Sequence, residues 1–229
     1  MTISEILKKF NIAISAEQIA NLDKYYKLLV EWNEKMNLTA ITDYDEVLVK
    51  HFADSIIGLP YFSGKCLDVG AGAGFPSVPL VIMGVNNFLC ADSLEKRIKF
   101  LNEVKNELQL NFDTLHIRAE DMGKGAYRES FDTVTARAVA NTVTLSEYLL
   151  PLVKLGGKAV LYKGGDIDEE ISGARYAIGL LGGKIDKIEK YEFMGLKRSL
   201  VIISKVKPTP NAYPRGGNKP KNQPLLGEK

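Results

Sequence analysis

The stretch that decides the fold is Asp68-Val69-Gly70-Ala71-Gly72-Ala73-Gly74-Phe75-Pro76. It follows directly on a short apolar segment, and its glycines alternate with small or apolar residues. A glycine immediately after a strand permits a tight turn, and a second glycine lets the backbone approach a ligand closely. The stretch therefore predicts a strand, a cofactor-binding turn and a following helix.

From residue 65 onward, short apolar segments alternate with amphipathic ones. This alternation is typical of a parallel sheet covered on both faces, so we expect a doubly wound α/β fold. The expected strands are 65–69, 87–91, 113–117, 131–135, 157–162, 184–193 and 198–206, and the expected helices between them are 76–84, 94–108, 141–154 and 168–181. The last two strands have no helix between them, so they must run antiparallel.

The spacing of the glycines argues against a dinucleotide cofactor. Dinucleotide-binding turns follow the pattern G-x-G-x-x-G, in which the third small residue allows close packing of helix and strand. Here the spacing is G-x-G-x-G, and the position that needs the third small residue is Phe75. A dehydrogenase is therefore disfavoured.

Acidic residues follow the next two expected strands. Asp92 lies 22 positions after Gly70 and can accept hydrogen bonds from both hydroxyls of a ribose. The pair Glu120-Asp121 ends the third strand, where an adenine ring would lie. Each acid alone could be a helix cap or a solvated residue. Ligands of open α/β sheets bind at the carboxyl ends of strands, so the three strand ends together favour a nucleoside site.

The composition is that of an ordinary soluble globular protein. Of the 229 residues, 45% are hydrophobic and 25% charged, and the net charge is only +2. The longest apolar runs are far shorter than the roughly 20 residues that span a bilayer. The N-terminus has no secretory pattern, so we expect a cytoplasmic protein without membrane contact. Two cysteines, Cys66 and Cys90, and two distant histidines give no zinc-ligand spacing, so no metal is expected.

Two further segments flank the expected core at 61–207. Residues 1–60 predict a helical extension, with Ser15 and Gln18 as a capping box and a second helix beginning at Asp43. Residues 208–229 form a Pro- and Gly-rich tail with a basic excess. We expect this tail not to pack into the core, and to be either disordered or a contact arm for an anionic surface. Its deletion should then leave cofactor affinity intact.

The chain resembles the bacterial RsmG family, formerly called GidB, over nearly its whole length. The segments that carry the resemblance are Trp32-Asn33-Glu34-Lys35-Met36-Asn37-Leu38-Thr39, His51-Phe52-Ala53-Asp54-Ser55, Asp68 to Pro76, Arg118-Ala119-Glu120, Thr135-Ala136-Arg137-Ala138-Val139-Ala140 and Tyr213-Pro214-Arg215.

The resemblance implies a Rossmann-like class I methyltransferase that uses S-adenosylmethionine. Its implied substrate is guanine N7 in the decoding-region loop of 16S rRNA, in the small ribosomal subunit, and we expect a monomer. The family's cofactor contacts carry over onto Gly70, Phe75, Ala119, Glu120 and Arg137, with Asp92 in the matching acidic position. With Gly72 and Ser93 added, these are the expected cofactor-binding residues.

Guanine N7 already presents a lone pair, so its methylation needs alignment and no general base. We therefore expect no catalytic residue, although Arg137 could orient the substrate or the cofactor. His51 is more simply a hydrogen-bonded partner of a neighbour. Lys163 and Arg198 could flank the substrate opening, or either could simply be a solvated charge. Two alternatives remain open: a methyltransferase for small molecules or proteins, and a non-catalytic RNA-binding module with the same fold.

Overall fold

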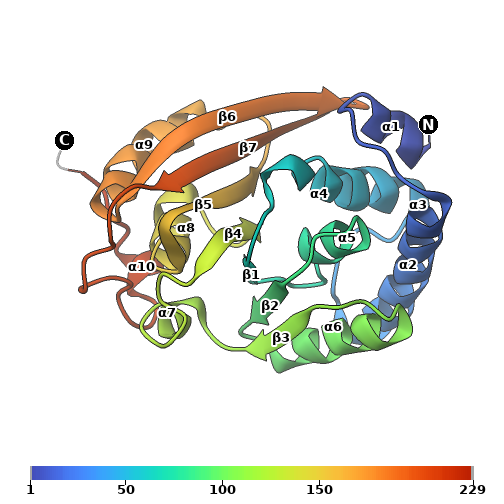
Figure 1. Cartoon of the computed structure of the whole chain (residues 1–229), viewed down its shortest axis with the longest axis horizontal. Helices are drawn as coiled ribbons and strands as arrows, with labels where there is room; N and C mark the ends of the chain where they lie inside the picture. The colour runs from blue at the N-terminus through green and yellow to red at the C-terminus, as the bar shows by residue number, and fades with distance from the viewer. Residues whose placement is uncertain (1, 228–229) are drawn as a thin grey trace.

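A single mixed sheet forms the centre of the computed structural model, which describes residues 2–227 (Figure 1). Its seven strands lie in the order β3-β2-β1-β4-β5-β7-β6. They are β1 (Cys66–Val69), β2 (Phe88–Asp92), β3 (Asp113–His116), β4 (Phe131–Arg137), β5 (Val153–Lys163), β6 (Gly183–Phe193) and β7 (Leu196–Lys205). Strand β7 runs antiparallel to both of its neighbours, whereas β1 to β5 pair in parallel. The expected doubly wound sheet is confirmed.

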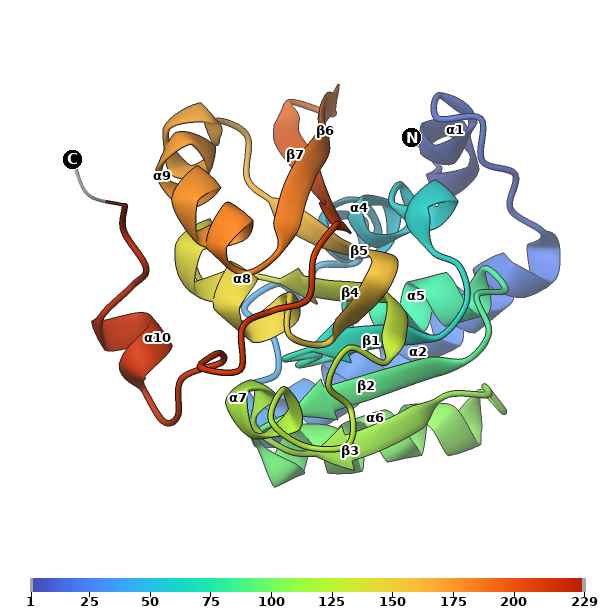
Figure 2. The same ribbon diagram turned by 60° about the vertical axis from the view of Figure 1, so that its left-hand side comes forward.

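Helices cover both faces of this sheet (Figure 2). One face carries α1 (Ile3–Lys8), α2 (Ala16–Met36), α3 (Tyr44–Val47), the π-helix η1 (Leu48–Ala53), α4 (Asp54–Ile56), the 3₁₀ turn η2 (Leu59–Tyr61), α5 (Ser77–Ile82) and α6 (Glu95–Glu107). The other carries α7 (Ala119–Met122), α8 (Thr142–Leu149) and α9 (Asp168–Leu180), with α10 (Lys219–Asn222) beside α8.

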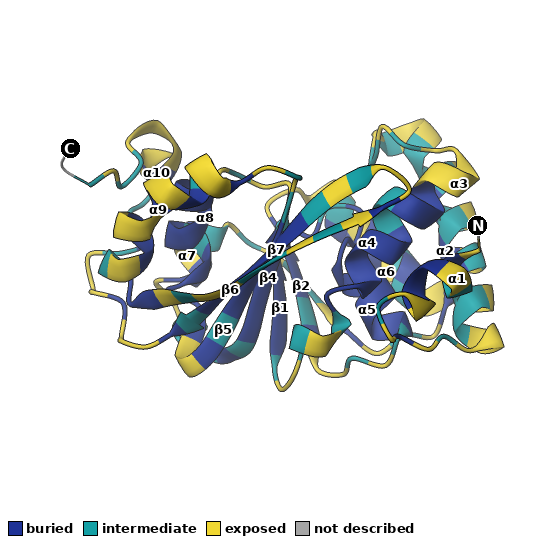
Figure 3. Cartoon of the chain, turned by 90° about the horizontal axis from the view of Figure 1, so that it is seen from above, coloured by how far each residue is buried: buried dark blue, intermediate teal, exposed yellow. Residues whose placement is uncertain are grey.

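Each face has its own apolar core because side chains alternate along a strand. In β1, for example, Cys66 belongs to the first cluster and Leu67 to the second. Figure 3 shows the central strands buried between the two helical layers. Within residues 2–227, no helix has the length and apolar character needed to cross a membrane. The strand order of the sheet reverses between β1 and β4. The carboxyl ends of these two strands therefore border the crevice in which such sheets bind ligands.

The N-terminal helices begin where the sequence predicts. At the start of α2, the Gln18 amide donates to Ser15 Oγ at 3.1 Å and Gln18 Oε1 accepts from the Ser15 amide at 2.8 Å. Asp43 caps α3 through one bond, in which its Oδ1 accepts from the Glu46 amide at 3.0 Å. The second helix is not regular, however, because its middle part, η1, has π geometry. Such segments often occur at functional sites, and this one carries His51 and ends next to Asp54.

Some strand and helix limits differ from the expectation. Strand β3 lies at the sheet edge, and its His116 is exposed, although the strands were expected to be covered on both faces. Helix α8 ends at Leu149, earlier than the expected 154. Strand β5 begins at Val153, earlier than the expected 157, because Val153 still pairs with Phe131 of β4 across an irregularity in the ladder.

The expectation that the tail would not pack is wrong for its described part, residues 208–227. Thr209 and Pro214 are buried, and Arg215 forms an ion pair with Glu147 of α8. The basic excess of the tail is therefore partly neutralised by a buried carboxylate, and is not left to solvent. Residues 228 and 229 of the expected tail lie outside the described residues.

Candidate active site

The glycine turn between β1 and α5 forms the floor of the site. The amides of Gly70 and Ala71 both donate to the Ala91 carbonyl of β2, at 2.8 and 3.0 Å. Gly72 has a φ of +61°, and a Cβ placed on it would have no neighbour closer than the Gly70 oxygen at 3.8 Å. This side of the turn is thus open, and a ligand can approach the backbone closely.

The other side of the turn is packed against the N-terminal helices. Tyr25 of α2 is fully buried and donates its hydroxyl to the Ala73 carbonyl. A Cβ on Gly74 would come within 2.6 Å of Val78 and 2.9 Å of that hydroxyl. Gly74 therefore serves helix packing, while Gly72 faces the open space.

Asp92, at the end of β2, lies beside this turn with only 2% of its surface exposed. Its Oδ2 accepts from the Gly72 amide at 2.9 Å and from Arg97 Nη1 at 3.1 Å, and its Oδ1 accepts from the Leu94 amide at 2.9 Å. A carboxylate offers about four acceptor positions. Two ribose hydroxyls can be accommodated once Arg97, which is 36% exposed, turns away.

Two hollows meet at Asp92. The first, of about 320 Å³, extends toward Ala119, Glu120 and Tyr148. The second, of about 430 Å³, extends over the glycine turn toward His51 and Arg137. The eight residues that we expected from the sequence to bind the cofactor all line one or both of these hollows. They are Gly70, Gly72, Phe75, Asp92, Ser93, Ala119, Glu120 and Arg137.

These hollows suit an adenosine with a charged side arm. Their volumes fall within the roughly 300–1,000 Å³ of small-molecule sites. The buried Asp92 carboxylate at their junction complements a ribose diol, the open face of Gly72 leaves room for the ligand, and the Arg137 guanidinium complements a carboxylate. The residues present therefore fit S-adenosylmethionine.

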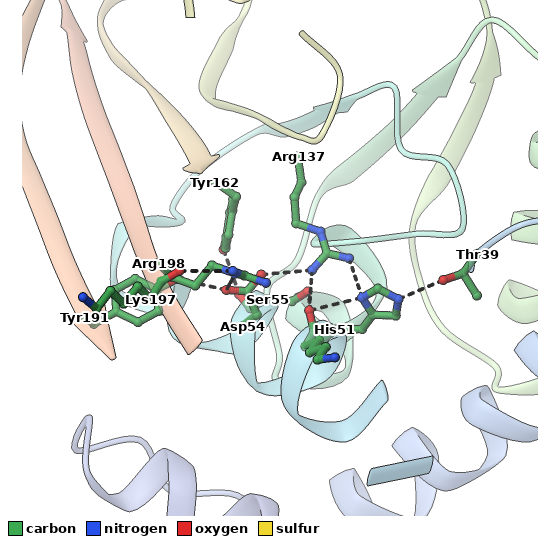
Figure 4. Close-up of polar contacts among 10 residues, drawn as sticks. Thr39, His51, Asp54, Ser55, Arg137, Tyr162, Tyr191, Lys197 and Arg198 are labelled. Atoms are coloured by element: carbon green, nitrogen blue, oxygen red, sulfur yellow. Dashed lines mark hydrogen bonds and ion pairs between the residues drawn. The ribbon is translucent and has the colours of Figure 1, made fainter. Parts of the chain in front are cut away.

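Arg137, at the end of β4, is held in a network of buried polar groups (Figure 4). Its Nη1 donates to Asp54 Oδ2 at 3.1 Å and to the Lys50 carbonyl at 3.2 Å. Its guanidinium lies 4.8 Å from the centre of the Phe75 ring. Only 13% of the Arg137 side chain is exposed, so its ion pair with Asp54 is buried in the site and does not lie on the surface.

Asp54 links this network to the last strands of the sheet (Figure 4). Its Oδ1 accepts from Tyr191 of β6 at 3.2 Å and pairs with Arg198 Nε of β7 at 3.3 Å. Burial raises the pKa of Asp54, and the two arginines oppose that effect. Asp54 was not among the residues expected at the site. A usable signal was present, because Asp54 and Ser55 are polar residues that directly follow the apolar pair Phe52-Ala53 on an expected helix.

His51 is neutral in this setting. Burial, together with the nearby Arg137 charge, lowers its pKa to about 4. Arg137 Nη2 lies 3.2 Å from His51 Nδ1, and Thr39 Oγ1 lies 3.0 Å from Nε2. Nδ1 also lies 3.1 Å from the Lys50 carbonyl, so this nitrogen stands between a guanidinium that can only donate and a carbonyl that can only accept. The ring also stacks on Phe75 at 4.5 Å, which agrees with its expected role as a partner of neighbouring residues.

A third hollow, of about 390 Å³, adjoins the second through His51 and Arg137. Its rim carries Lys50, Lys163 and Arg198. Lys163 and Arg198 thus line the same hollow, and its role as the substrate opening stays a prediction. Lys163 Nζ is itself held by Glu170 at 2.7 Å and the Ala140 carbonyl at 3.0 Å.

Asp68 of β1 lies beneath the turn and is fully buried. Burial raises its pKa to about 7, against the opposing hydrogen bonds from Ser77. Its Oδ2 accepts from the Ser77 amide at 3.3 Å, while Oδ1 has no partner among the described atoms. Asp68 thus carries a proton over part of the neutral range.

The fold and the site together define a class I methyltransferase that uses S-adenosylmethionine. Solved structures of the same fold include magnesium protoporphyrin IX methyltransferase from Synechocystis PCC 6803 with bound SAM, with a TM-score of 0.56 and 13% identity over 78% of this chain and 96% of that one. Another is a branched-chain polyamine synthase from Thermus thermophilus, with a TM-score of 0.58 and 13% identity over 85% of this chain and 68% of that one. At this identity the similarity concerns the fold.

Sequence comparison identifies the family. The model of the GidB family, rRNA small subunit methyltransferase G, matches residues 18–200. Ribosomal RNA small subunit methyltransferase G of Staphylococcus aureus strain Newman is 48% identical over 98% of this chain and 97% of its own length, and that of strain bovine RF122 / ET3-1 is 49% identical over the same shares. The chain belongs to the GidB family, as its motifs suggested.

Proposed function

We propose that this enzyme transfers a methyl group from S-adenosylmethionine to N7 of a guanine in the decoding-region loop of 16S rRNA. The observation that carries the proposal is the third hollow, which adjoins the cofactor hollows through Arg137 and is lined by four cations, Lys50, Arg137, Lys163 and Arg198. Three carboxylates, Glu46, Asp54 and Glu170, pair with them, so one positive charge is in excess, and a positive excess complements RNA phosphates. The relatives named above are ribosomal RNA small subunit methyltransferases, which supports the same substrate class.

The polar groups around the third hollow support an acceptor that needs no deprotonation. His51 and Asp54 are the bases nearest to it, and both are occupied: Nδ1 of His51 by Arg137, and the Asp54 carboxylate by Arg137, Arg198 and Tyr191. A neutral imidazole whose pKa is about 4 is a weak base at pH 7. Guanine N7 offers a lone pair directly.

The remaining roles follow from position. When bound, S-adenosylmethionine supplies an electrophilic methyl carbon. In our proposal Gly70, Gly72, Asp92 and Ser93 hold the ribose, and Ala119 and Glu120 lie at the adenine. Phe75 and Arg137 lie at the amino-acid end, where the guanidinium orients a carboxylate. The chain's contribution to rate is then proximity and alignment, because its residues hold both reactants in adjoining hollows.

We also propose that the enzyme acts as a cytoplasmic monomer. Its segments would be a helical extension at 1–60, the cofactor-binding core at 61–207 and the basic tail at 208–229. Light scattering of the purified chain during gel filtration tests the monomer, and a mass near 50 kDa, twice the chain mass of 25.3 kDa, contradicts it.

Methyl transfer to isolated small ribosomal subunits tests the function. The chain is incubated with labelled S-adenosylmethionine and either subunits or protein-free 16S rRNA, and the product is cleaved with borohydride and aniline, which break RNA at N7-methylguanosine. We expect one cleavage, within the decoding-region loop. Label in ribosomal protein, label without aniline cleavage, or no transfer at all would each contradict the proposal. The first points to the protein methyltransferase alternative.

A further inference from the structure

The C-terminal tail runs along the rim of the first cofactor hollow. Asn218 and Lys221 line that hollow together with Asp92, Ser93 and Glu120. Both tail residues belong to the short segment around α10, more than 90 positions beyond Glu120 in the chain. In Figure 2 this segment lies beside α8, close to α7. Neither residue is among the cofactor contacts proposed above.

The segment is clamped to α8 at two places. Arg215 donates to the buried Glu147 carboxylate three times: from its amide at 2.8 Å, from Nε at 2.9 Å and from Nη2 at 2.7 Å. Thr144 Oγ1 donates to the Pro220 carbonyl at 3.1 Å. A bidentate pair on a carboxylate that is 1% exposed fixes orientation as well as position. Asn218 therefore lies between two anchored positions, and Lys221 directly follows the second of them.

A third contact ties the segment to the hollow itself. Arg118 donates from Nε to Glu120 Oε1 at 2.6 Å and from Nη2 to Asn218 Oδ1 at 3.2 Å. Arg118 thus joins the tail to the acid at the adenine end. The carbonyl oxygen of Asn218 is used by this contact, and its amide group still carries two N–H donors. The Lys221 ammonium carries three.

These donors match the edge of an adenine. The ring nitrogens of adenine are acceptors, as N7 and N3 are in DNA grooves, and the far end of the first hollow is the place where the adenine lies in the proposed arrangement. We infer that Asn218 and Lys221 are cofactor-binding residues, and that the tail forms the outer wall of the adenosine end. This inference rests on the proposed cofactor placement. It reverses the expectation that tail deletion leaves cofactor affinity intact.

Equilibrium binding of two stable ligands tests the inference. S-adenosylhomocysteine contains the whole cofactor frame, and 5′-methylthioadenosine lacks the amino-acid arm. The variants are Asn218→Ala and Lys221→Ala, and the matched control is Lys219→Ala, which removes the same charge from the same helix at a position that does not line the hollow. All three side chains are exposed, so the fold should be retained.

We expect Asn218→Ala and Lys221→Ala each to weaken both ligands by the same factor, about threefold to tenfold, as for one lost hydrogen bond. Lys219→Ala should bind both as wild type does. Arg137→Lys should weaken S-adenosylhomocysteine alone, because only that ligand reaches the other end.

Unchanged affinity of the Asn218→Ala/Lys221→Ala double variant, or a loss equal to that of Lys219→Ala, would overturn the inference and leave the methyltransferase function intact. A wild-type chain that binds neither ligand would overturn the cofactor placement as well. Methyl transfer to RNA is measured separately, so failure of the inference and failure of the proposed function are distinguishable.

Discussion

A single methyl group on Gly72 probes the cofactor turn most selectively. The Gly72→Ala side chain would point into the second hollow, since its nearest neighbour is the Gly70 oxygen at 3.8 Å. It would therefore occupy ligand space without displacing protein atoms. Gly156→Ala is the matched control: Gly156 also has a positive φ, +79°, its added methyl meets nothing within 4 Å, and it lines neither cofactor hollow.

The two substitutions should have similar effects on stability and different effects on binding. Each places a Cβ in a left-handed backbone conformation, which costs about 1–2 kcal/mol. Only Gly72→Ala also crowds the ligand. Forcing one methyl into an occupied, packed space costs about 1–3 kcal/mol, which corresponds to roughly fivefold to 150-fold weaker binding.

Calorimetric titration with S-adenosylhomocysteine measures the binding, and urea denaturation without ligand measures the stability. We expect Gly72→Ala to bind at least fivefold more weakly than Gly156→Ala, at a comparable loss of unfolding free energy. If the two variants bind within twofold of each other, the cofactor does not lie against this turn.

Three further outcomes follow from individual side chains. Asp92→Ala should weaken S-adenosylhomocysteine binding by about 1.5–3 kcal/mol, since it removes a charged acceptor, and a calorimetric loss below about 0.5 kcal/mol would make Asp92 a bystander. Asp54→Asn should lower the unfolding free energy by about 3 kcal/mol, because two arginines lose their buried partner, and a wild-type urea midpoint would refute this. His51 has a pKa of about 4 in the fold and an ordinary value of 6.5, so the unfolded chain binds the extra proton between these values. Its contribution to stability is present above pH 6.5 and is lost as pH falls toward 4, by at most about 1.4 kcal/mol per pH unit. His51→Gln should remove this part of the pH dependence, and an unchanged slope in urea titrations would contradict the assignment.

Much of the fold could be predicted because its signals are local. The glycine turn, the alternation of apolar strands with amphipathic helices, and the caps at Ser15 and Asp43 each lie within a few residues of the element they define. The exposure of His116 could not be predicted, since it depends on β3 being the sheet edge. Strand order is a property of the whole sheet.

The residues that line the two hollows at Asp92 could be predicted, and those around the third hollow only partly. The residues of the glycine turn and of the strand ends after β2 and β3 are recognisable because topology brings consecutive strand ends together. Asp54 was not predicted as a site residue because its partners, Arg137 and Arg198, lie 83 and 144 positions away in the chain. The tail was misjudged for a similar reason: the carboxylate that neutralises Arg215 is Glu147, 68 positions earlier in the chain. Charge counted along the sequence does not show which charges are paired in space.

The most direct test of the central claim is a crystal structure of the chain with S-adenosylhomocysteine. We expect both ribose hydroxyls within hydrogen-bond distance of the Asp92 carboxylate, Arg97 turned away from it, and the adenine beside Glu120 at the wall formed by Asn218 and Lys221. A ligand found elsewhere, or an Asp92 carboxylate still closed by Arg97 with ligand bound, would contradict it.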